Sequence, residues 1–163
     1  MIDIGAGASV LAERLVEDGI DRVTVLDISQ QALAAMSERS GHHPGISIVI
    51  ADITDWSPQQ TWDLWHDRAV FHFLTEPADQ TAYTTATAWA VAPGGVAVVG
   101  CFAPGGPTQC SGLPIVQYGP EELAAQFAPE FELERSEHEI HQTPNGLTQP
   151  FTWVVMRRQP STY

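Results

Sequence analysis

The sequence predicts an α/β fold in which a mostly parallel, doubly wound sheet carries helices on both faces. Short apolar segments alternate along the chain with polar turns and Ala-rich segments of helical spacing. This alternation is typical of parallel strands joined by crossover helices. The last two predicted strands, residues 131–141 and 151–158, have no helix between them. Such a pair predicts one antiparallel addition at an edge of the sheet.

Length and composition indicate one domain that spans residues 1–163. The chain has 163 residues, of which 44% are hydrophobic and 17% are charged. One domain commonly holds this many residues, and the apolar fraction suffices for a sizeable core. We therefore expect a single folded unit.

The charge balance narrows the possible partners. The chain has 20 acidic residues and 7 basic ones, a net charge of −13, and every basic residue is an arginine. The absence of lysine excludes Schiff-base chemistry, and the acidic balance argues against nucleic acid or an anionic membrane as the main partner. No apolar run could span a bilayer and no signal peptide is visible, so we expect a cytoplasmic protein.

The individual elements follow from apolar spacing and turn residues. Strands are predicted at residues 1–4, 23–27, 46–51, 62–65, 96–102, 131–141 and 151–158. Helices are predicted at residues 8–17, 29–36, 77–90 and from residue 119 onwards. Ser29 is a suitable N-cap, and Pro120 suits the first turn of the last helix. Turns are expected at residues 93–95, before the fifth strand, and at a Pro-Asn-Gly segment between the last two strands.

Ligands of such sheets bind where the strands end, so the residues that close the strands are candidates for the site. Asp3, Gly5, Ala6 and Gly7 lie at the first strand–helix turn, where glycines allow a ligand to approach the backbone. A plain tight turn explains this segment equally well. The dinucleotide fingerprint G-x-G-x-x-G fails, because Val10 stands at its third glycine.

Two further carboxylates close the next two strands. Asp27 follows Gly7 by twenty residues and could accept hydrogen bonds from two ribose hydroxyls. Asp52 ends the third strand, where it could accept one from an adenine amine. Acids at three consecutive strand ends are harder to explain by chance than any one of them.

These segments, together with Trp62-Asp63-Leu64-Trp65 and Pro93-Gly94-Gly95, resemble the class I S-adenosylmethionine-dependent methyltransferases over essentially the whole chain. The resemblance implies a Rossmann-like sheet of seven strands in the order 3-2-1-4-5-7-6, with strand seven antiparallel. It also implies which residues contact the cofactor: Asp3, Gly5, Ala6 and Gly7 at the methionine end, Asp27 and Ile28 at the ribose, Asp52 and Ile53 at the adenine, and His66. Ser9 departs from the family's usual third glycine.

The acidic strand ends agree with this cofactor. S-adenosylmethionine carries a cationic sulfonium and a cationic amine, and only its carboxylate is anionic. Carboxylates would attract such a ligand and repel the pyrophosphate of NAD. We therefore expect S-adenosylmethionine as cofactor and S-adenosylhomocysteine as product, in preference to NAD.

Candidate catalytic residues follow the fourth predicted strand. His66 could act as a base or hold the substrate, Asp67 could orient His66, and Arg68 could clamp a substrate carboxylate. An equally weighted interpretation is that His66 contacts the cofactor and that Arg68 forms a structural pair with an acid. His72 lies in an apolar stretch and is interpreted as a packed histidine.

The acceptor is expected to be a small molecule. The Asn/Asp-Pro-Pro-aromatic segment of base-directed amino-methyltransferases is absent at residues 65–68, and metal ligands of catechol-type enzymes are absent after the fifth strand. The histidines and the two cysteines make no convincing metal site. Two alternatives remain open: a protein-directed methyltransferase, and a binding module that holds the cofactor without turnover.

Other side chains have two interpretations each. Cys110 could touch a soft substrate, although a small hydrophobe in a loop is favoured. The tryptophans at 56, 62, 65 and 89 are interpreted as core or pocket wall.

Met1 stands only two residues before Asp3, whereas methyltransferases of this class usually carry helices ahead of the first strand. With these N-terminal cap helices absent, we expect an open cofactor site, weak cofactor affinity, and low activity unless another chain covers the site. A homodimer that covers the exposed region is the expected remedy. Two alternatives are a start codon assigned too far downstream and a lidless enzyme that accepts bulky substrates.

Overall fold

The computed structural model describes residues 1–143 and 146–160. The strands are β1 Ile2–Ile4, β2 Val23–Asp27, β3 Ile46–Ile50, β4 Trp62–Arg68, β5 Val91–Phe102, β6 Gln109–Cys110, β7 Leu113–Pro114, β8 Phe131–Gln142 and β9 Thr148–Arg158. The helices are α1 Leu11–Glu17, α2 Gln30–Arg39, α3 Pro77–Ala90, α4 Pro120–Gln126 and the short 3₁₀ helix η1 Phe71–Phe73.

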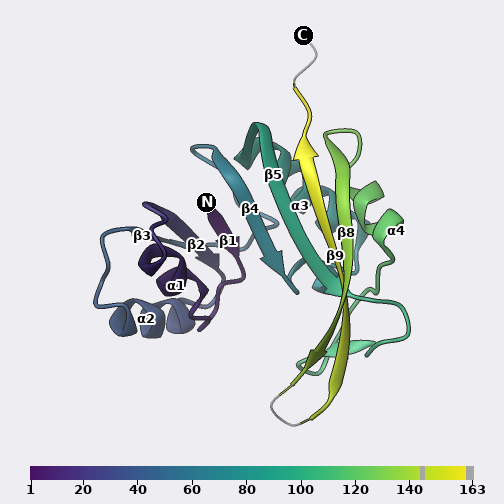
Figure 1. The fold of residues 1–163 in the computed structure, drawn as a ribbon, viewed down its shortest axis with the longest axis horizontal. Coiled ribbons are helices and arrows are strands. Elements are labelled where there is room, and N and C mark those ends of the chain that lie inside the picture. The colour runs from purple at the N-terminus through teal and green to yellow at the C-terminus, as the bar shows by residue number, and fades with distance from the viewer. Residues whose placement is uncertain (144–145, 161–163) are drawn as a thin grey trace.

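Seven strands form one sheet in the order β3-β2-β1-β4-β5-β9-β8 (Figure 1). The first five pair in parallel, while β9 runs antiparallel to both β5 and β8. Because β6 and β7 form a separate two-stranded hairpin, β8 and β9 are the sixth and seventh strands of the predicted sheet. The predicted fold class and strand order are confirmed.

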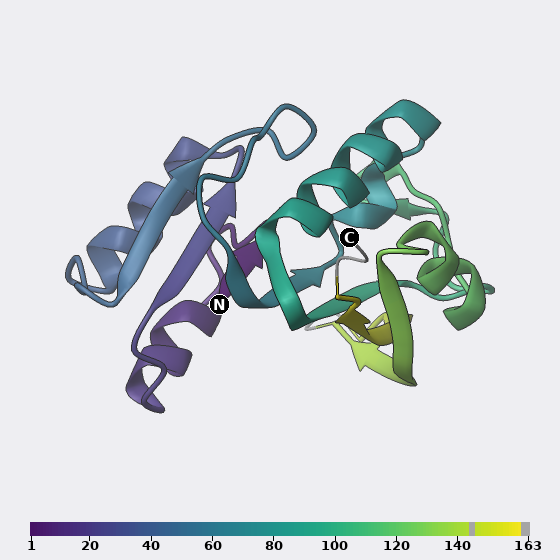
Figure 2. The ribbon, with the colours of Figure 1, turned by 90° about the horizontal axis from the view of Figure 1, so that it is seen from above.

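The helices cover different halves of the sheet on opposite faces. One buried cluster joins α1 and α2 to β2 through Ala12, Leu33, Met36 and Val25. A larger cluster packs α3 and α4 against the central and C-terminal strands, and these helices lie along that half of the molecule (Figure 2). The short central strand β1 is buried throughout, with Ile2 in the larger cluster.

Local signals placed several element ends correctly. The Ser29 hydroxyl accepts a hydrogen bond from the backbone N–H of Ala32 at 3.2 Å and caps α2 as predicted. At α4, the carboxylate of Glu122 accepts from the backbone N–H of Gly119 at 3.0 Å. In both contacts a side-chain oxygen accepts from a backbone N–H group at the start of a helix, where such groups lack a partner within the helix.

Other expectations for the elements were wrong. The first helix begins at Leu11 and not at residue 8, and β4 continues to Arg68 and not only to residue 65. The predicted turn at residues 93–95 lies inside β5: Trp62 pairs with Val91 and Leu64 pairs with Val96, so the residues between bulge out of the ladder. The hairpin of β6 and β7 was not predicted, and Pro144 and Asn145 of the expected closing turn lie outside the described residues.

The strands β8 and β9 continue past the end of β5 as a twisted ribbon (Figure 1).

In the described part of the chain, no helix has the length and apolar character needed to cross a membrane.

Candidate functional site

Two adjoining hollows lie where β1, β2 and β4 end, and both are lined by Ile4 and Gly5. The first, of about 210 Å³, lies over the ends of β2 and β3 and has a mainly apolar lining: Ile4, Gly5, Leu26, Asp27, Ile28, Ala51, Asp52, Ile53, Val70 and Phe73. The second, of about 350 Å³, lies over β1 and β4 and is polar: Asp3, Ile4, Gly5, Ala6, Ser9, Leu11, His66 and Arg68. All the predicted site residues except Gly7 and Asp67 line one of them.

The glycine turn between the two hollows needs glycine at position 5. Its φ is +66°, and a Cβ there would lie 2.1 Å from a methyl carbon of Val70. The backbone N–H groups of Gly5 and Ala6 both donate to the carbonyl oxygen of Leu26, at 2.8 and 3.3 Å. The turn is therefore fixed against the end of β2.

Asp27 is held by backbone groups on two sides. Its Oδ2 accepts from the N–H of Gly7 at 2.8 Å, and its Oδ1 accepts from the N–H of Ser29 at 2.7 Å. Each carboxylate oxygen can accept more than one hydrogen bond. Asp27 can therefore organise the glycine turn and still accept from a ligand.

Asp52 is exposed at the opposite rim of the apolar hollow. Its Oδ1 accepts from the backbone N–H of Thr54 at 2.9 Å and from the Thr54 hydroxyl at 2.7 Å. These hydrogen bonds lower the pKa of Asp52 below its ordinary value. The side chain is therefore ionised at neutral pH.

His66 is paired with Asp3 across neighbouring parallel strands. The two residues are partners in the register of β1 and β4, and Nδ1 of His66 lies 2.7 Å from Oδ1 of Asp3. A carboxylate accepts, so Nδ1 carries a proton, and a ring that carries only this proton has Nε2 as an acceptor. The His66 side chain is 20% exposed and lines the polar hollow.

The expectation that Asp67 orients His66 was wrong. Successive side chains of a strand point to opposite faces, so Asp67 points into the core beneath α3. There its carboxylate accepts from the N–H groups of Val70 and Phe71, at 2.8 and 3.0 Å, and from the Tyr83 hydroxyl at 2.5 Å. Burial raises the pKa of Asp67 to about 6. It stabilises the η1 segment, and Asp3 takes the position beside His66.

Arg68 lies at the edge of the polar hollow and is exposed. Its guanidinium carbon lies 5.0 Å from the ring centre of Phe151, a cation–π arrangement. Within residues 1–143 and 146–160, Arg68 forms no ion pair, so the expected structural pair with an acid is not seen there.

His72 is buried, as predicted. Its Nδ1 accepts from the backbone N–H of Phe102 at 3.3 Å, and its ring makes edge contacts with Phe73 and Phe102. Burial lowers the pKa of His72 to about 4.

Cys110 is a half-buried free thiol in β6 and lines neither hollow.

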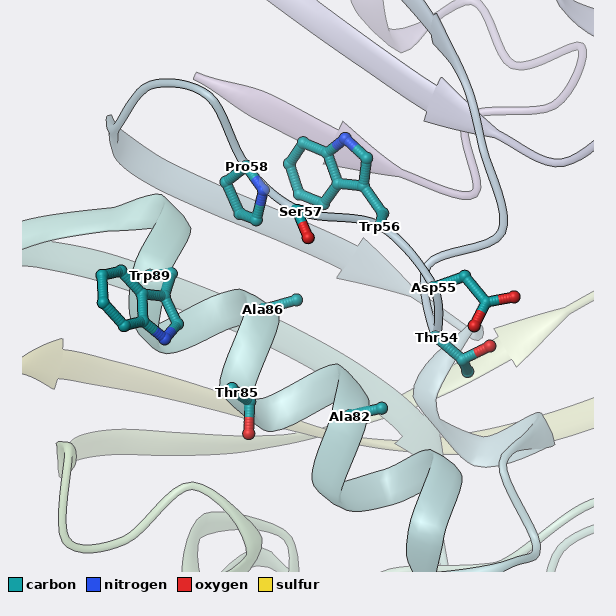
Figure 3. A pocket seen from close by; sticks show the side chains of 9 residues that line it. All are labelled: Thr54, Asp55, Trp56, Ser57, Pro58, Ala82, Thr85, Ala86 and Trp89. Carbon is teal, nitrogen blue, oxygen red and sulfur yellow. The ribbon is translucent and has the colours of Figure 1, made fainter.

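The tryptophans divide between core and surface. Trp65 is fully buried and donates to the Tyr83 hydroxyl at 3.1 Å, while Trp56 packs against it with ring centres 6.4 Å apart. Trp89 is 73% exposed and is not part of the core. It stands beside a separate hollow of about 420 Å³ between α3 and the segment that contains Trp56 and Pro58 (Figure 3).

Sequence reasoning missed Trp153, which stacks on His66 from β9. The ring centres are 5.9 Å apart and the planes are inclined by 24°. Trp153 lies opposite Gly100 in the pairing of β5 with β9. A glycine inside a predicted strand signals a close approach of another group, so Gly100 was the available signal.

Comparison with known proteins identifies the family. The family model described as "Methyltransferase domain" matches residues 1–95, which is more than half of the chain. One curated relative is malonyl-(acyl-carrier protein) O-methyltransferase 1 of Ilyobacter polytropus, 20% identical over 77 residues, which are 47% of this chain and 29% of the relative. Another is ribosomal RNA small subunit methyltransferase A of Rhodopseudomonas palustris, 36% identical over 59 residues, 36% of this chain and 21% of the relative. The chain thus spans well under half the length of these curated relatives.

Solved structures share the fold over nearly the whole chain. A structure described as "Conversion of a Disulfide Bond into a Thioacetal Group during Echinomycin Biosynthesis" has a TM-score of 0.80 and 21% identity, and the alignment covers 99% of this chain and 76% of that one. The N-methyltransferase NodS of Bradyrhizobium japonicum, in complex with S-adenosylhomocysteine, has a TM-score of 0.76 and 18% identity, covering 98% and 77% of the two chains. From the family match and the observed fold, the chain belongs to the methyltransferase domain family.

Proposed function

We propose that this protein is an S-adenosylmethionine-dependent methyltransferase that acts on a small-molecule nucleophile. The observation that carries the proposal is the pair of adjoining hollows that share Ile4 and Gly5, one apolar with carboxylates at its rim and one polar. Together they suit a ligand with a flat heterocycle and ribose at one end and an amino acid at the other. The NodS neighbour contains S-adenosylhomocysteine, which supports this ligand class.

The residues of the apolar hollow fit the adenosine half. Ile28, Ile53 and Phe73 would contact the adenine, and Asp27 would accept from the ribose hydroxyls. Asp52 would accept from the adenine amine through a carboxylate that is ionised and exposed. Apolar contact with a few placed acceptors is the usual composition of such a site.

The residues of the polar hollow fit the methionine half and the reacting end. The backbone of the glycine turn and Asp3 would contact the amino-acid portion, and Arg68 would bind a carboxylate of the cofactor or of the acceptor. When bound, the cofactor supplies an electrophilic methyl group for an in-line displacement. The chain's contribution is to align the two reactants, which supplies much of the rate enhancement.

We further propose that His66 removes the proton of the acceptor. Its Nδ1 proton is held by Asp3 at 2.7 Å, which leaves Nε2 as the acceptor. The alternative role of His66 is a direct contact with the cofactor. The two roles differ in whether loss of His66 lowers turnover alone or cofactor affinity as well.

A small molecule is favoured over RNA as the acceptor. The rRNA methyltransferases among the relatives bring RNA into consideration. The net charge of −13 and the absence of lysine disfavour contact with a phosphate backbone, and residues 65–68 read Trp-His-Asp-Arg. NodS and the Burkholderia thailandensis 1,6-didemethyltoxoflavin-N1-methyltransferase, a further structural neighbour with 19% identity and a TM-score of 0.77, are named for N-methyl transfer.

The test has two stages. Calorimetric titration with S-adenosylmethionine, S-adenosylhomocysteine and NAD comes first, and we expect the first two to bind and NAD not to bind. Mass spectrometry of products follows, with a panel of small amines, alcohols, thiols and carboxylic acids beside an RNA and a protein mixture. A methylated small molecule supports the proposal; methylated RNA or protein overturns the acceptor class, and cofactor binding with no product indicates a binding module.

A further inference from the structure

Trp153 reaches His66 across an intervening strand. His66 lies on β4 and Trp153 on β9, and β5 lies between these two strands in the sheet. Neighbouring strands are about 4.8 Å apart, so side chains two strands apart start about 9.6 Å from each other. The two rings nevertheless stack with centres 5.9 Å apart. The indole must therefore lie flat over β5.

Gly100 provides the space for this arrangement. It is the residue of β5 that pairs with Trp153, and its other neighbour in the register is Arg68 of β4. A Cβ on Gly100 would lie 2.7 to 2.8 Å from three carbon atoms of the indole. Any larger residue would push the indole away from the sheet, and thus away from His66.

The far end of the indole is anchored by β8. Nε1 of Trp153 donates to Oε2 of Glu139 at 2.6 Å, and Phe151 stacks on the indole with ring centres 6.1 Å apart. The position of Trp153 is thus fixed by a hydrogen bond on one side and by aromatic contact on another. The indole therefore gives the imidazole a fixed, flat surface on which to stack.

The orientation of His66 depends on this contact with Trp153. The imidazole torsion χ2 is broad, so the hydrogen bond to Asp3 leaves the ring free to rock or to turn over. To turn over, the imidazole would have to pass edge-on against the indole, so a fixed indole hinders this motion. The hydrogen bond to Asp3 selects the Nδ1 edge. Nε2 of His66 has no hydrogen-bond partner among residues 1–143 and 146–160.

We propose that Trp153, seated on Gly100 and anchored by Glu139, is a positioning residue that locks His66 with its Nδ1–H on Asp3 and its Nε2 as the free acceptor. An effect of this positioning on catalysis rests on the proposed function, because it requires that His66 acts on the acceptor. The lock itself is a property of the protein alone and can be measured without substrate.

The test uses four variants of the full chain: Trp153→Leu, Trp153→Phe, Gly100→Ala and the double variant of Gly100→Ala with Trp153→Leu. Trp89→Leu is the matched control, because it removes an indole far from His66 on the exposed face of α3. The first readout is the tautomer and ring exchange of His66 by nitrogen-15 NMR. The second, once an acceptor is found, is the separation of kcat from KM for S-adenosylmethionine.

In the wild type and in Trp89→Leu, we expect one His66 tautomer, with the proton on Nδ1. Trp153→Leu and Gly100→Ala should both give exchange between tautomers and a kcat lowered about ten- to hundredfold, with KM within about twofold. Trp153→Phe keeps a ring to stack on and should restore most of the single-tautomer signal. In the Trp153→Leu background, Gly100→Ala should have no further effect, because no indole is left to displace.

Additive losses from Gly100→Ala and Trp153→Leu, or an unchanged His66 tautomer in Trp153→Leu, would overturn the proposal. Failure of the proposed function gives a different pattern: the wild type would not bind S-adenosylmethionine, while the NMR differences among the variants would persist. The two failures are therefore distinguishable.

Discussion

The backbone N–H of Gly7 donates to Oδ2 of Asp27 at 2.8 Å, which ties the first strand–helix turn to the carboxylate that ends β2. A Cβ on Gly7 would lie 3.7 Å from the same oxygen atom. One carboxylate thus organises the turn at the methionine end of the proposed site and borders the hollow at its adenosine end. The two halves of the site are mechanically connected through Asp27.

This connection predicts unequal effects of the two rim carboxylates. Asp27→Ala should weaken S-adenosylmethionine binding more than Asp52→Ala, because Asp27 holds the Gly7 turn and would also accept from two ribose hydroxyls. Each hydrogen bond to a charged group contributes roughly 1.5–3 kcal/mol, so we expect a loss above tenfold for Asp27→Ala. Titration calorimetry measures both, with Asp55→Ala as the control for loss of a nearby negative charge. Equal losses would contradict the assigned roles.

A second prediction separates the two roles of His66. If Nε2 takes a proton from the acceptor, His66→Ala should lower kcat by about a hundredfold or more while cofactor affinity changes little. Asp3→Asn should give a smaller loss of the same kind, because an amide oxygen can still accept from Nδ1. Initial rates and calorimetry on the same preparations give the comparison. A parallel fall of affinity and turnover would make His66 a cofactor contact.

Local pattern was sufficient to bring together those candidate residues that end strands. Asp27 and Asp52 line the same hollow because each ends an apolar strand, and parallel strands bring their carboxyl ends together. The glycine turn was found because a turn of this kind needs left-handed backbone. These inferences require only the order of elements and no knowledge of register.

The pairings were missed because they depend on register and on strand length. Asp3 and His66 are 63 positions apart and meet only through the alignment of β1 with β4. Asp67 was misassigned because the predicted strand ended at Trp65. A strand that continued to Arg68 would have placed the side chains of His66 and Asp67 on opposite faces of the sheet. The bulge in β5 was interpreted as a turn because a Pro-Gly-Gly segment commonly breaks a strand.

Trp65 is buried and Trp89 is exposed, so their substitution should change stability by different amounts. Trp65→Ala should lower the free energy of unfolding by about 3–5 kcal/mol, because a fully buried indole leaves a cavity and the Tyr83 hydroxyl loses a donor. Trp89→Ala should change it by no more than about 0.5 kcal/mol, because that side chain is mostly exposed. Urea denaturation followed by circular dichroism tests both. A large loss at Trp89 would contradict the exposed position of its side chain.

Asp67 predicts a stability that falls with rising pH. Its pKa is about 6 in the folded chain against an ordinary value of 3.8, so the folded state binds the proton more tightly. The stability this supplies is complete below pH 3.8 and is lost as the pH rises through 6, by about 3 kcal/mol in total. Asp67→Asn removes this slope and keeps an oxygen that can accept from Val70. Urea midpoints between pH 4 and 7 give the slopes; an unchanged slope in the variant would exclude Asp67 as the source.

His72 predicts the opposite slope in nearly the same range. Its pKa is about 4 in the folded chain against an ordinary 6.5, because the buried ring resists charging. Here the unfolded state binds the proton more tightly, so stability is complete above pH 6.5 and falls by about 3 kcal/mol as the pH drops through 4. Protonation would also remove the Nδ1 acceptor of the Phe102 N–H.

The wild type should therefore show a shallow pH dependence between pH 4 and 6, because the contributions of Asp67 and His72 oppose each other there. His72→Gln removes the titrating ring and should expose the falling slope of Asp67, while Asp67→Asn should expose the rising slope of His72. The double variant should return to a shallow profile at lower overall stability. His42→Gln is the matched control, because it makes the same replacement at an exposed histidine. A wild-type profile as steep as that of either single variant would contradict the opposition, since one of the two groups would then not titrate as its burial requires.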